Sequence, residues 1–335
     1  MIQPILIFFK DVFARVFSTL RKIAVFVISF LFIMIMLSFI GNVMIGFGQA
    51  GAGTGLSANE VLIEDMGGEE KIVLVKLNGI ILSEYSGGFF ESATGIITPE
   101  YVRETLQTAA NDPMVRGVVL QINSPGGSPV ASDYIWETIQ DFKQDTGIPV
   151  VALMGDMATS GGYYIASIAD YIVANPATIT GSIGVILESY NLEELYEKIG
   201  VNKVTIKQGE YKDILNDSRA MTEDELEILN ALSEDTYEMF VQRVAAGREL
   251  PTETVLTYAN GQIYSGTQAK DLNLVDSLGN YNEAVYQAKS LANLDRYMVV
   301  EYSSSTLFSQ IFGEIKSALS PFSALAGGST LIQQR

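Results

Sequence analysis

Histidine and cysteine are both absent from this sequence of 335 residues. Without an imidazole, neither a Ser-His-Asp triad nor a histidine-ligated zinc site can be built. Without a thiol, disulfides, thiolate metal sites and cysteine nucleophiles are excluded as well. Any nucleophilic catalysis must therefore take its general base from Lys, Asp, Glu or Tyr.

Basic residues are scarce: 21 Lys and Arg stand against 39 Asp and Glu, which gives a formal net charge of −18. In the first fifty residues the cations Lys10, Arg15, Arg21 and Lys22 outnumber the anion Asp11, so the acidic excess lies beyond them. An acidic body repels phosphate groups, which makes DNA or RNA a poor partner. We expect no nucleic acid binding.

Charged residues are also missing between Ile23 and Asn59. Within this stretch, residues 23–46 are almost wholly apolar, and they are long enough to cross a hydrocarbon core of about 30 Å. We expect one transmembrane helix over 23–46. Because cations precede it and acidic residues follow it, the positive-inside rule places residues 1–22 in the cytoplasm and the main body outside.

A cleaved signal peptide is the alternative interpretation of the same stretch, since Ala50, Gly51 and Ala52 resemble a cleavage site. The apolar run is much longer than the roughly 7–15 residues of a signal peptide, which favours a retained anchor. Residues 46–51 also match GxGxxG, but they follow a membrane span rather than a strand. We therefore expect no dinucleotide, no other cofactor and no metal.

Beyond the span, the composition divides the chain into a linker (47–70), a folded domain (71–302) and a tail rich in Ser, Ala and Gly (303–335). In the domain, β-branched runs alternate with helical patterns, which predicts an α/β fold with a parallel sheet. Strands are expected over 72–77, 115–122, 148–154, 171–174 and 201–206, and helices over 99–110, 130–145, 161–169 and 192–198. Thr98 is expected to cap the helix over 99–110, with Pro99 at its first position. Thr222 and Glu225 form the pattern of a capping box before a long helix.

Ser160 is the first candidate for chemistry. It lies in a glycine-rich stretch, residues 155–164, that follows an expected strand and opens an expected helix. Backbone N–H groups and the dipole at a helix N-terminus favour a developing negative charge, which suits an acyl-transfer nucleophile. The alternative is that Ser160 merely caps the helix. Ala158 also stands where the nucleophile elbow G-x-S-x-G has its first glycine.

A second glycine-rich turn, residues 123–127, follows the strand expected over 115–122. The ends of neighbouring parallel strands meet at one edge of a sheet, so this turn and Ser160 can face the same crevice. The backbone N–H groups of Gly127 and Gly161 could then form an oxyanion hole. An ordinary Pro-Gly turn is the alternative.

Lysine is the credible general base, because burial can lower its pKa from about 10.4 toward about 7–8. Lys212 follows an expected strand and precedes the long helix, but spacing alone does not select it. A solvated side chain is the default for the other lysines beyond the span. Those considered are Lys71, Lys143, Lys270 and Lys316.

Four short motifs occur in order along the chain: NSPGG (123–127), GDMATSGGYYIA (155–166), TGSIGVI (180–186) and EYKDI (210–214). They closely resemble motifs of signal peptide peptidase A, in its short, single-repeat bacterial form. Two further stretches, AAGREL and ANGQIYSGTQAKDLNLVDSLG, are similar as well. The resemblance covers about residues 71–291.

This resemblance implies a ClpP/crotonase-like fold, in which helices pack on a parallel sheet, and it makes 71–302 a protease domain. It places Ser160 at the nucleophile position and Lys212 at the general-base position. Ser182 falls where the family has a serine that hydrogen-bonds the lysine amine. Gly127 and Gly161 fall on the oxyanion-hole positions. The missing elbow glycine is no departure from this family.

The resemblance also implies a serine endopeptidase that degrades remnant signal peptides and other membrane or envelope polypeptides. It implies a ring-like homo-oligomer in which serine and lysine come from neighbouring subunits. The location implied is the bacterial inner membrane, with a single span, the N-terminus inside and the catalytic domain outside. No cofactor is implied.

Two other functions fit the same fold. A crotonase-type acyl-CoA enzyme shares the paired oxyanion amides, but it would bind CoA and would not depend on Ser160. A non-catalytic membrane scaffold would keep the fold and would be indifferent to the loss of Ser160 or Lys212.

Overall fold

A computed structural model of the chain describes residues 60–84 and 95–302. The expected N-terminal segment (1–22), transmembrane helix (23–46) and tail (303–335) lie outside the described residues. In the part that is described, no helix combines the length and apolar character that a membrane span requires.

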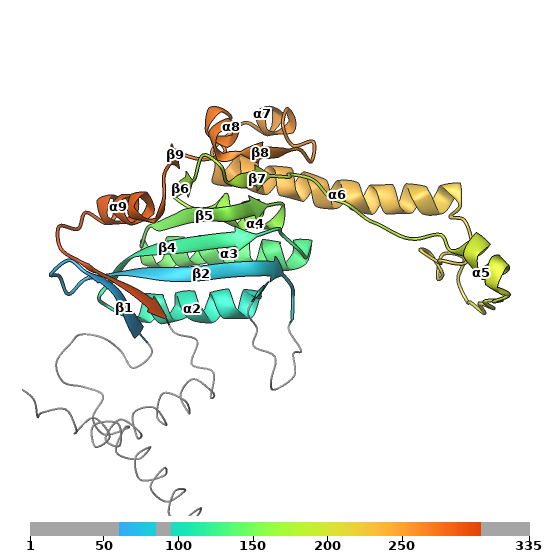
Figure 1. The fold of residues 1–335 in the computed structure, drawn as a ribbon, viewed down its shortest axis with the longest axis horizontal. Helices are drawn as coiled ribbons and strands as arrows, with labels where there is room; N and C mark the ends of the chain where they lie inside the picture. The colour runs from blue at the N-terminus through green and yellow to red at the C-terminus, as the bar shows by residue number, and fades with distance from the viewer. Residues whose placement is uncertain (1–59, 85–94, 303–335) are drawn as a thin grey trace, which may run out of the picture. The chain divides into compact units, whose positions relative to one another are not determined.

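The described residues form a mixed α/β domain (Figure 1). The strands are β1 (Glu60–Asp65), β2 (Lys71–Ile81), β3 (Gly95–Ile97), β4 (Val115–Ser124), β5 (Val150–Thr159), β6 (Tyr171–Ala174), β7 (Ile179–Gly181), β8 (Ile263–Ser265), β9 (Ser277–Leu278) and β10 (Met298–Tyr302). The helices are α2 (Pro99–Asn111), α3 (Pro129–Thr146), α4 (Gly161–Ala166), α5 (Glu193–Ile199), α6 (Glu223–Gly247), α7 (Thr252–Leu256), α8 (Gly266–Asp271) and α9 (Tyr281–Leu291).

The sheet has the strand order β1-β10-β2-β4-β5-β6-β9, and β2, β4, β5, β6 and β9 pair in parallel. Only β1 with β10 and β7 with β8 pair antiparallel among the described strands. The predicted α/β fold with a mostly parallel sheet is therefore confirmed.

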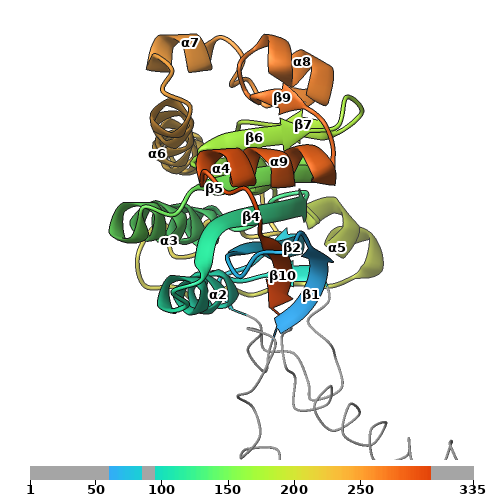
Figure 2. The ribbon, with the colours of Figure 1, turned by 90° about the vertical axis from the view of Figure 1, so that its left-hand side faces the viewer.

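Both faces of the central sheet are buried, as near-continuous β-branched runs predict. Along β2, Ile72 and Val73 point to opposite faces, and both are fully buried. Ala284 and Val285 of α9 pack against Ile72 and its neighbours on one face. Helices α2 and α3 lie side by side (Figure 2). The core thus holds β4 and β5 rigidly, and these are the strands that lead into the two glycine-rich turns.

Two helix starts follow the sequence signals closely. Thr98 caps α2 by accepting a hydrogen bond from the backbone N–H of Tyr101. Thr222 and Glu225 form a capping box at the start of α6, with both reciprocal hydrogen bonds present. The predicted caps are confirmed.

The structure corrects the predicted boundary of the folded domain. The predicted linker, residues 47–70, contains β1, which pairs with β10 at the edge of the sheet. Lys71 was expected to be solvated, but it is 2% exposed and forms ion pairs with Glu60 (2.8 Å) and Asp112 (2.9 Å). The folded domain therefore includes β1, which was not predicted because its partner strand, β10, is distant in the sequence.

The strand predicted over residues 201–206 is absent, and this prediction is wrong. The segment contains β-branched residues, but Val204 is 77% exposed and Ile206 is 91% exposed. No neighbouring strand pairs with it in the described part of the chain. Since strand propensity mostly reflects packing on a pleated surface, a β-branched run without a partner has little reason to be a strand.

The segment belongs to an arm, which we define as residues 187–232, between β7 and the middle of α6. In Figure 1 the arm extends away from the edge at which β2, β4 and β5 end, and α5 lies at its tip. Many of its large apolar side chains are exposed. Those at least 40% exposed are Leu187, Tyr190, Leu195, Ile199, Val201, Val204, Ile206, Tyr211, Leu215, Leu226 and Leu232.

An ion-pair network ties the loop around Lys212 to the start of α6. Asp213 accepts hydrogen bonds from Arg219 Nε (3.1 Å) and pairs with Lys207. Arg219 Nη1 also donates to Glu225 Oε2 (2.7 Å) in the capping box. Hydrogen bonds from Arg219 and Lys207 hold the pKa of the Asp213 carboxyl well below its usual range. These hydrogen bonds and ion pairs give the loop a defined shape.

Candidate active site

Ser160 stands between the end of β5 and the start of α4, with φ 51° and ψ −122°. This backbone conformation is uncommon for a residue with a side chain and costs of order 1–3 kcal/mol. Its backbone N–H donates to Gly181 O (2.9 Å), which fixes the residue to the end of β7. The Ser160 side chain makes no capping hydrogen bond. The alternative that Ser160 merely caps α4 is thus not what the structure shows.

A bulge in β5 brings Ser160 to this position. Ile122 pairs with Met154, but Ser124 pairs with Ala158, so β5 contains extra residues relative to β4. Asn123 Oδ1 accepts a hydrogen bond from the backbone N–H of Met157 (3.1 Å) inside the bulge. The strand predicted over 148–154 therefore continues to Thr159 and leads directly into Ser160, where the sequence suggested a loop.

The two glycine-rich turns pack against each other at Ser160. A Cβ atom on Gly126 would lie 2.7 Å from Gly161 N and 2.9 Å from Ser160 Cβ. One on Gly161 would lie 2.5 Å from Ser132 Oγ and 3.3 Å from Gly127 N. Glycine is therefore required for the close approach of the two backbones. Within the described part of the chain, neither the Gly127 nor the Gly161 N–H donates a hydrogen bond.

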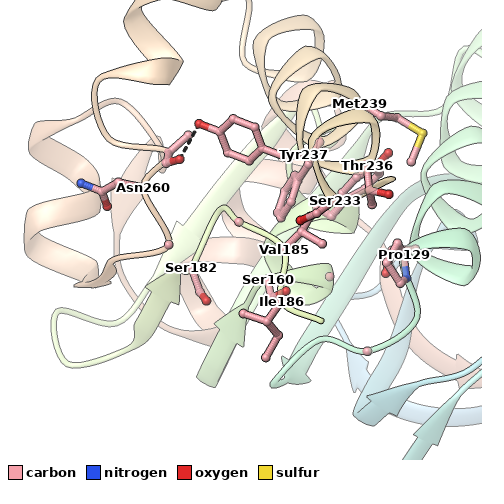
Figure 3. Close-up of a pocket in the computed structure, with 18 of the residues that line it drawn as sticks. Pro129, Ser160, Ser182, Val185, Ile186, Ser233, Thr236, Tyr237, Met239 and Asn260 are labelled. Carbon is pink, nitrogen blue, oxygen red and sulfur yellow. Dashed lines mark hydrogen bonds between the residues drawn. The ribbon is translucent and has the colours of Figure 1, made fainter. Parts of the chain in front are cut away.

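Ser160, Gly127 and Gly161 line one cavity of about 690 Å³ (Figure 3). Ser182 lines it as well and follows β7, which pairs in parallel with the end of β5. The backbone N–H of Ser182 donates to Gln262 O (2.8 Å), which holds it at φ 52°. The structure thus brings together four of the five residues that the sequence points to.

Lys212 is the fifth, and it lies in the arm, outside the residues that line the cavity. Among the described residues, no lysine or arginine lines the cavity. Tyr164 and Tyr237 line it, but their hydroxyls donate to Asp133 Oδ1 and to Ala259 O. Burial and the neighbouring Asp133 carboxylate raise the pKa of Tyr164 well above its usual value, so its hydroxyl stays protonated.

The amine of Lys212 differs from the other lysine amines of the arm. Lys198, Lys203 and Lys207 each form an ion pair with a carboxylate. Among the described residues, the Lys212 side chain has no ion pair, and it is exposed.

The competing lysines of the domain are already engaged. Lys71 is buried in its ion pairs with Glu60 and Asp112. Lys143 pairs with Asp170 (2.8 Å), and Lys270 donates to a backbone carbonyl. Lys316 lies outside the described residues. Compared with these described lysines, Lys212 therefore differs in having no ion pair or side-chain hydrogen bond.

The sequence did not predict that α6 forms one side of the cavity. Ser233, Thr236 and Tyr237 of α6 cover it, as Figure 3 shows, and Phe240 lies one turn further along the helix. The helical period of α6 is visible in the sequence, but nothing local indicates that this helix crosses the ends of β5 and β7. No cluster of acidic side chains in the described ranges could hold a metal.

Comparisons with known proteins place the chain among the peptidases. A model of peptidase family S49 matches residues 142–295, which include Ser160, Ser182 and Lys212. A protein of Synechocystis named as a putative protease is 47% identical over 178 residues, which are 53% of this chain and 64% of that protein.

Two further relatives are named SppA or SPPA, and the first of these names is spelled out as signal peptide peptidase, the family that the four motifs resemble. "Putative signal peptide peptidase SppA" of Enterococcus faecium is 34% identical over 247 residues, covering 74% of this chain and 71% of the relative. "Serine protease SPPA, chloroplastic" of Arabidopsis thaliana is 34% identical over 229 residues, covering 68% of this chain but only 33% of the relative. The chain belongs to peptidase family S49, and it is of the signal peptide peptidase A type. The resemblance drawn from the four motifs is confirmed.

Proposed function

We propose that this protein is a serine endopeptidase in which Ser160 is the nucleophile and Lys212 of a neighbouring copy is the general base. The observation that carries the proposal is the geometry of Ser160. Its backbone is held in an uncommon conformation, and its side chain makes no capping hydrogen bond. Gly127 and Gly161, whose N–H groups donate no hydrogen bond among the described residues, line the same cavity. Backbone outliers of this kind cluster at functional sites.

The mechanism follows from these positions. Neutral Lys212 takes the proton of Ser160, whose oxygen attacks the carbonyl carbon of a peptide bond. The N–H groups of Gly127 and Gly161 hold the oxyanion that forms. Lys212 then gives the proton to the leaving amine, and it next activates a water molecule that releases the acyl group from Ser160. Ser182 is proposed to orient the amine of Lys212 by a hydrogen bond.

The arm supports a site shared between copies of the chain. It carries Lys212 beyond the domain and exposes a series of apolar side chains that a neighbouring copy could cover. The described part of the chain contributes no basic side chain to the cavity around Ser160. A head-to-tail contact of this kind, repeated, closes into a ring when the rotation allows it. We therefore propose a ring-like homo-oligomer with intersubunit sites and a ClpP/crotonase-like fold in each subunit.

The proposed substrates are remnant signal peptides and other membrane or envelope polypeptides. The name of the Enterococcus relative and the apolar residues around the cavity support this substrate class. The apolar run over residues 23–46 supports anchoring by a single span in the bacterial inner membrane. With residues 1–22 in the cytoplasm, the catalytic domain would be extracytoplasmic.

A fluorophosphonate tests the nucleophile directly, because it phosphonylates an activated serine with loss of fluoride. We expect mass spectrometry to find one adduct, on the peptide that contains Ser160, and no adduct in a Lys212→Ala variant. Ser277→Ala is the control, because it keeps Ser160 and Lys212, lies outside the cavity lining and should still be labelled. An adduct on another serine, or equal labelling without Lys212, would refute the assignment. Binding of CoA with no labelling would favour the acyl-CoA enzyme.

Gly126→Ala is expected to lower kcat/KM for peptide cleavage about 100-fold, the effect of losing one oxyanion donor. Gly126 has φ +99°, and its Cβ would lie 2.7 Å from Gly161 N, so the two turns must separate. Gly147→Ala is the matched control, since Gly147 also has positive φ (+67°) but a Cβ there meets nothing within 4 Å. Equal loss of activity in both variants would show that backbone strain alone is responsible.

A further inference from the structure

A carboxylate outside the proposed catalytic residues joins three helices at the cavity. Asp133 lies on α3, and its Oδ1 accepts a hydrogen bond from Tyr164 Oη on α4 (2.8 Å). The same oxygen accepts a hydrogen bond from Arg243 Nε on α6 (2.8 Å). One oxygen atom therefore connects α3, α4 and α6.

Arg243 is held by further contacts, which fix the direction of its guanidinium group. Its Nη2 donates to Glu137 Oε1 (2.6 Å), and its guanidinium carbon lies 4.2 Å from the centre of the Trp136 ring. A planar guanidinium that stacks on an aromatic ring and binds two carboxylates has a preorganised orientation that a lysine cannot reproduce. Asp133 is therefore held in place by a rigid partner rather than by a mobile surface charge.

The residues that Asp133 joins shape the cavity. Tyr164 is on α4, one turn beyond Gly161, and its ring lines the cavity. The ring centre of Phe240 on α6 lies 4.8 Å from that of Tyr164, and Phe240 lines the cavity too. Helix α6 also supplies Thr236 and Tyr237 to the cavity lining. The parts of the cavity lining that come from α4 and from α6 thus contact each other through Tyr164 and Phe240.

We propose that Asp133, held by Arg243, is a positioning residue that fixes α4 against α6 and so sets how large an apolar substrate side chain the cavity accepts. The inference rests on the proposed function. Without the hydrogen bond between Asp133 and Tyr164, the aromatic rings of Tyr164 and Phe240 can move. The backbone around Ser160 and the two oxyanion-hole glycines keeps its contacts. The network should therefore act on discrimination between substrate side chains, and not on the chemical step.

Two peptides that differ only in alanine or leucine before the cleaved bond measure this discrimination. Tyr164→Phe keeps the ring and removes the hydroxyl. Arg243→Lys keeps the positive charge but removes the planar guanidinium group that binds both Asp133 and Glu137. In both variants we expect the ratio of kcat/KM for the two peptides to change about tenfold, which corresponds to a hydrogen bond with a charged group. We expect kcat for the better peptide to change less than about twofold. An unchanged ratio in both variants would overturn the proposal.

Arg248→Lys is the matched control, because Arg248 ends the same helix and pairs with Asp276 (2.6 Å) away from the cavity. We expect this variant to lower the melting temperature and to leave the peptide ratio unchanged. If Arg248→Lys shifted the ratio as much as Arg243→Lys does, the network would have only a structural role, which contradicts the proposal.

A second measurement does not depend on cleavage. Trp136 is the only tryptophan of the sequence, and it lies under Arg243, so its emission reports on the network. In Ser160→Ala, we expect an apolar peptide of alanine and leucine to shift this emission on binding. The shift should be lost when Tyr164→Phe is added, while fluorescence polarisation of the labelled peptide still shows binding. The same shift in both proteins would overturn the proposal.

The two measurements together separate the inference from the proposed function. If no peptide is cleaved, but the emission shift requires Tyr164, the peptidase proposal fails and the positioning role stands. If peptides are cleaved in a Ser160-dependent reaction and the ratio does not respond to Tyr164 or Arg243, the positioning role fails and the peptidase proposal stands.

Discussion

Ser160→Ala is expected to lower kcat/KM for peptide cleavage about 10⁴-fold or more, which is the order seen when the nucleophile of a serine peptidase is removed. The variant loses the proposed nucleophile, and the sequence has no cysteine or histidine to replace it. The fold should remain intact, because the Ser160 hydroxyl forms no capping bond and its removal breaks no structural contact. Cleavage of a fluorogenic peptide and the melting temperature of the same preparation measure both effects.

Ser277→Ala is the control for this variant. Its hydroxyl is buried and has no hydrogen-bond partner among the described residues, and it lies away from the cavity. We expect its activity to equal that of the unmodified protein. Undiminished cleavage by Ser160→Ala would contradict the assignment of the nucleophile.

Lys212→Ala is expected to lower kcat/KM about 10³-fold or more, because general base catalysis and activation of the nucleophile fail together. Lys212 makes no ion pair among the described residues, so its loss should leave the arm intact. The loop around it is held instead by Asp213, Arg219 and Glu225. The variant should therefore assemble normally, which sedimentation or light scattering will show.

Lys203→Ala is the matched control in the arm. Lys203 pairs with Asp217, and Tyr196 also donates to that carboxylate (2.6 Å), so its role there is structural. We expect this variant to retain most of the activity. If Lys203→Ala and Lys212→Ala lost activity equally, the effect would come from the arm and not from a general base.

The sequence predicts much of the fold because its strand and helix signals are local. The apolar runs predicted as strands over 72–77, 115–122 and 171–174 correspond to β2, β4 and β6. Thr98 and Thr222 mark helix starts that the structure confirms. Local signals failed where pairing partners are distant. Residues 201–206 have strand composition but no partner, and β1 has a partner, β10, at the opposite end of the domain.

The candidate site divides in the same way. Ser160 and the two glycines can be found from the sequence, because a serine and a Pro-Gly turn after successive parallel strands must meet at one edge of the sheet. Spacing alone did not select Lys212, since its place in the arm depends on contacts around Arg219 and not on the sheet. The roles of Asp133 and Arg243 were not visible either, because they depend on how α6 crosses the cavity.

Mixing two inactive variants tests the central claim most directly. Ser160→Ala supplies an intact Lys212, and Lys212→Ala supplies an intact Ser160. If the two residues act across an interface, random co-assembly gives about a quarter of the interfaces both intact residues in a head-to-tail ring. We predict that the co-assembled mixture recovers about that share of the original activity. A mixture that exchanges subunits and stays as inactive as either variant alone would contradict a site shared between subunits.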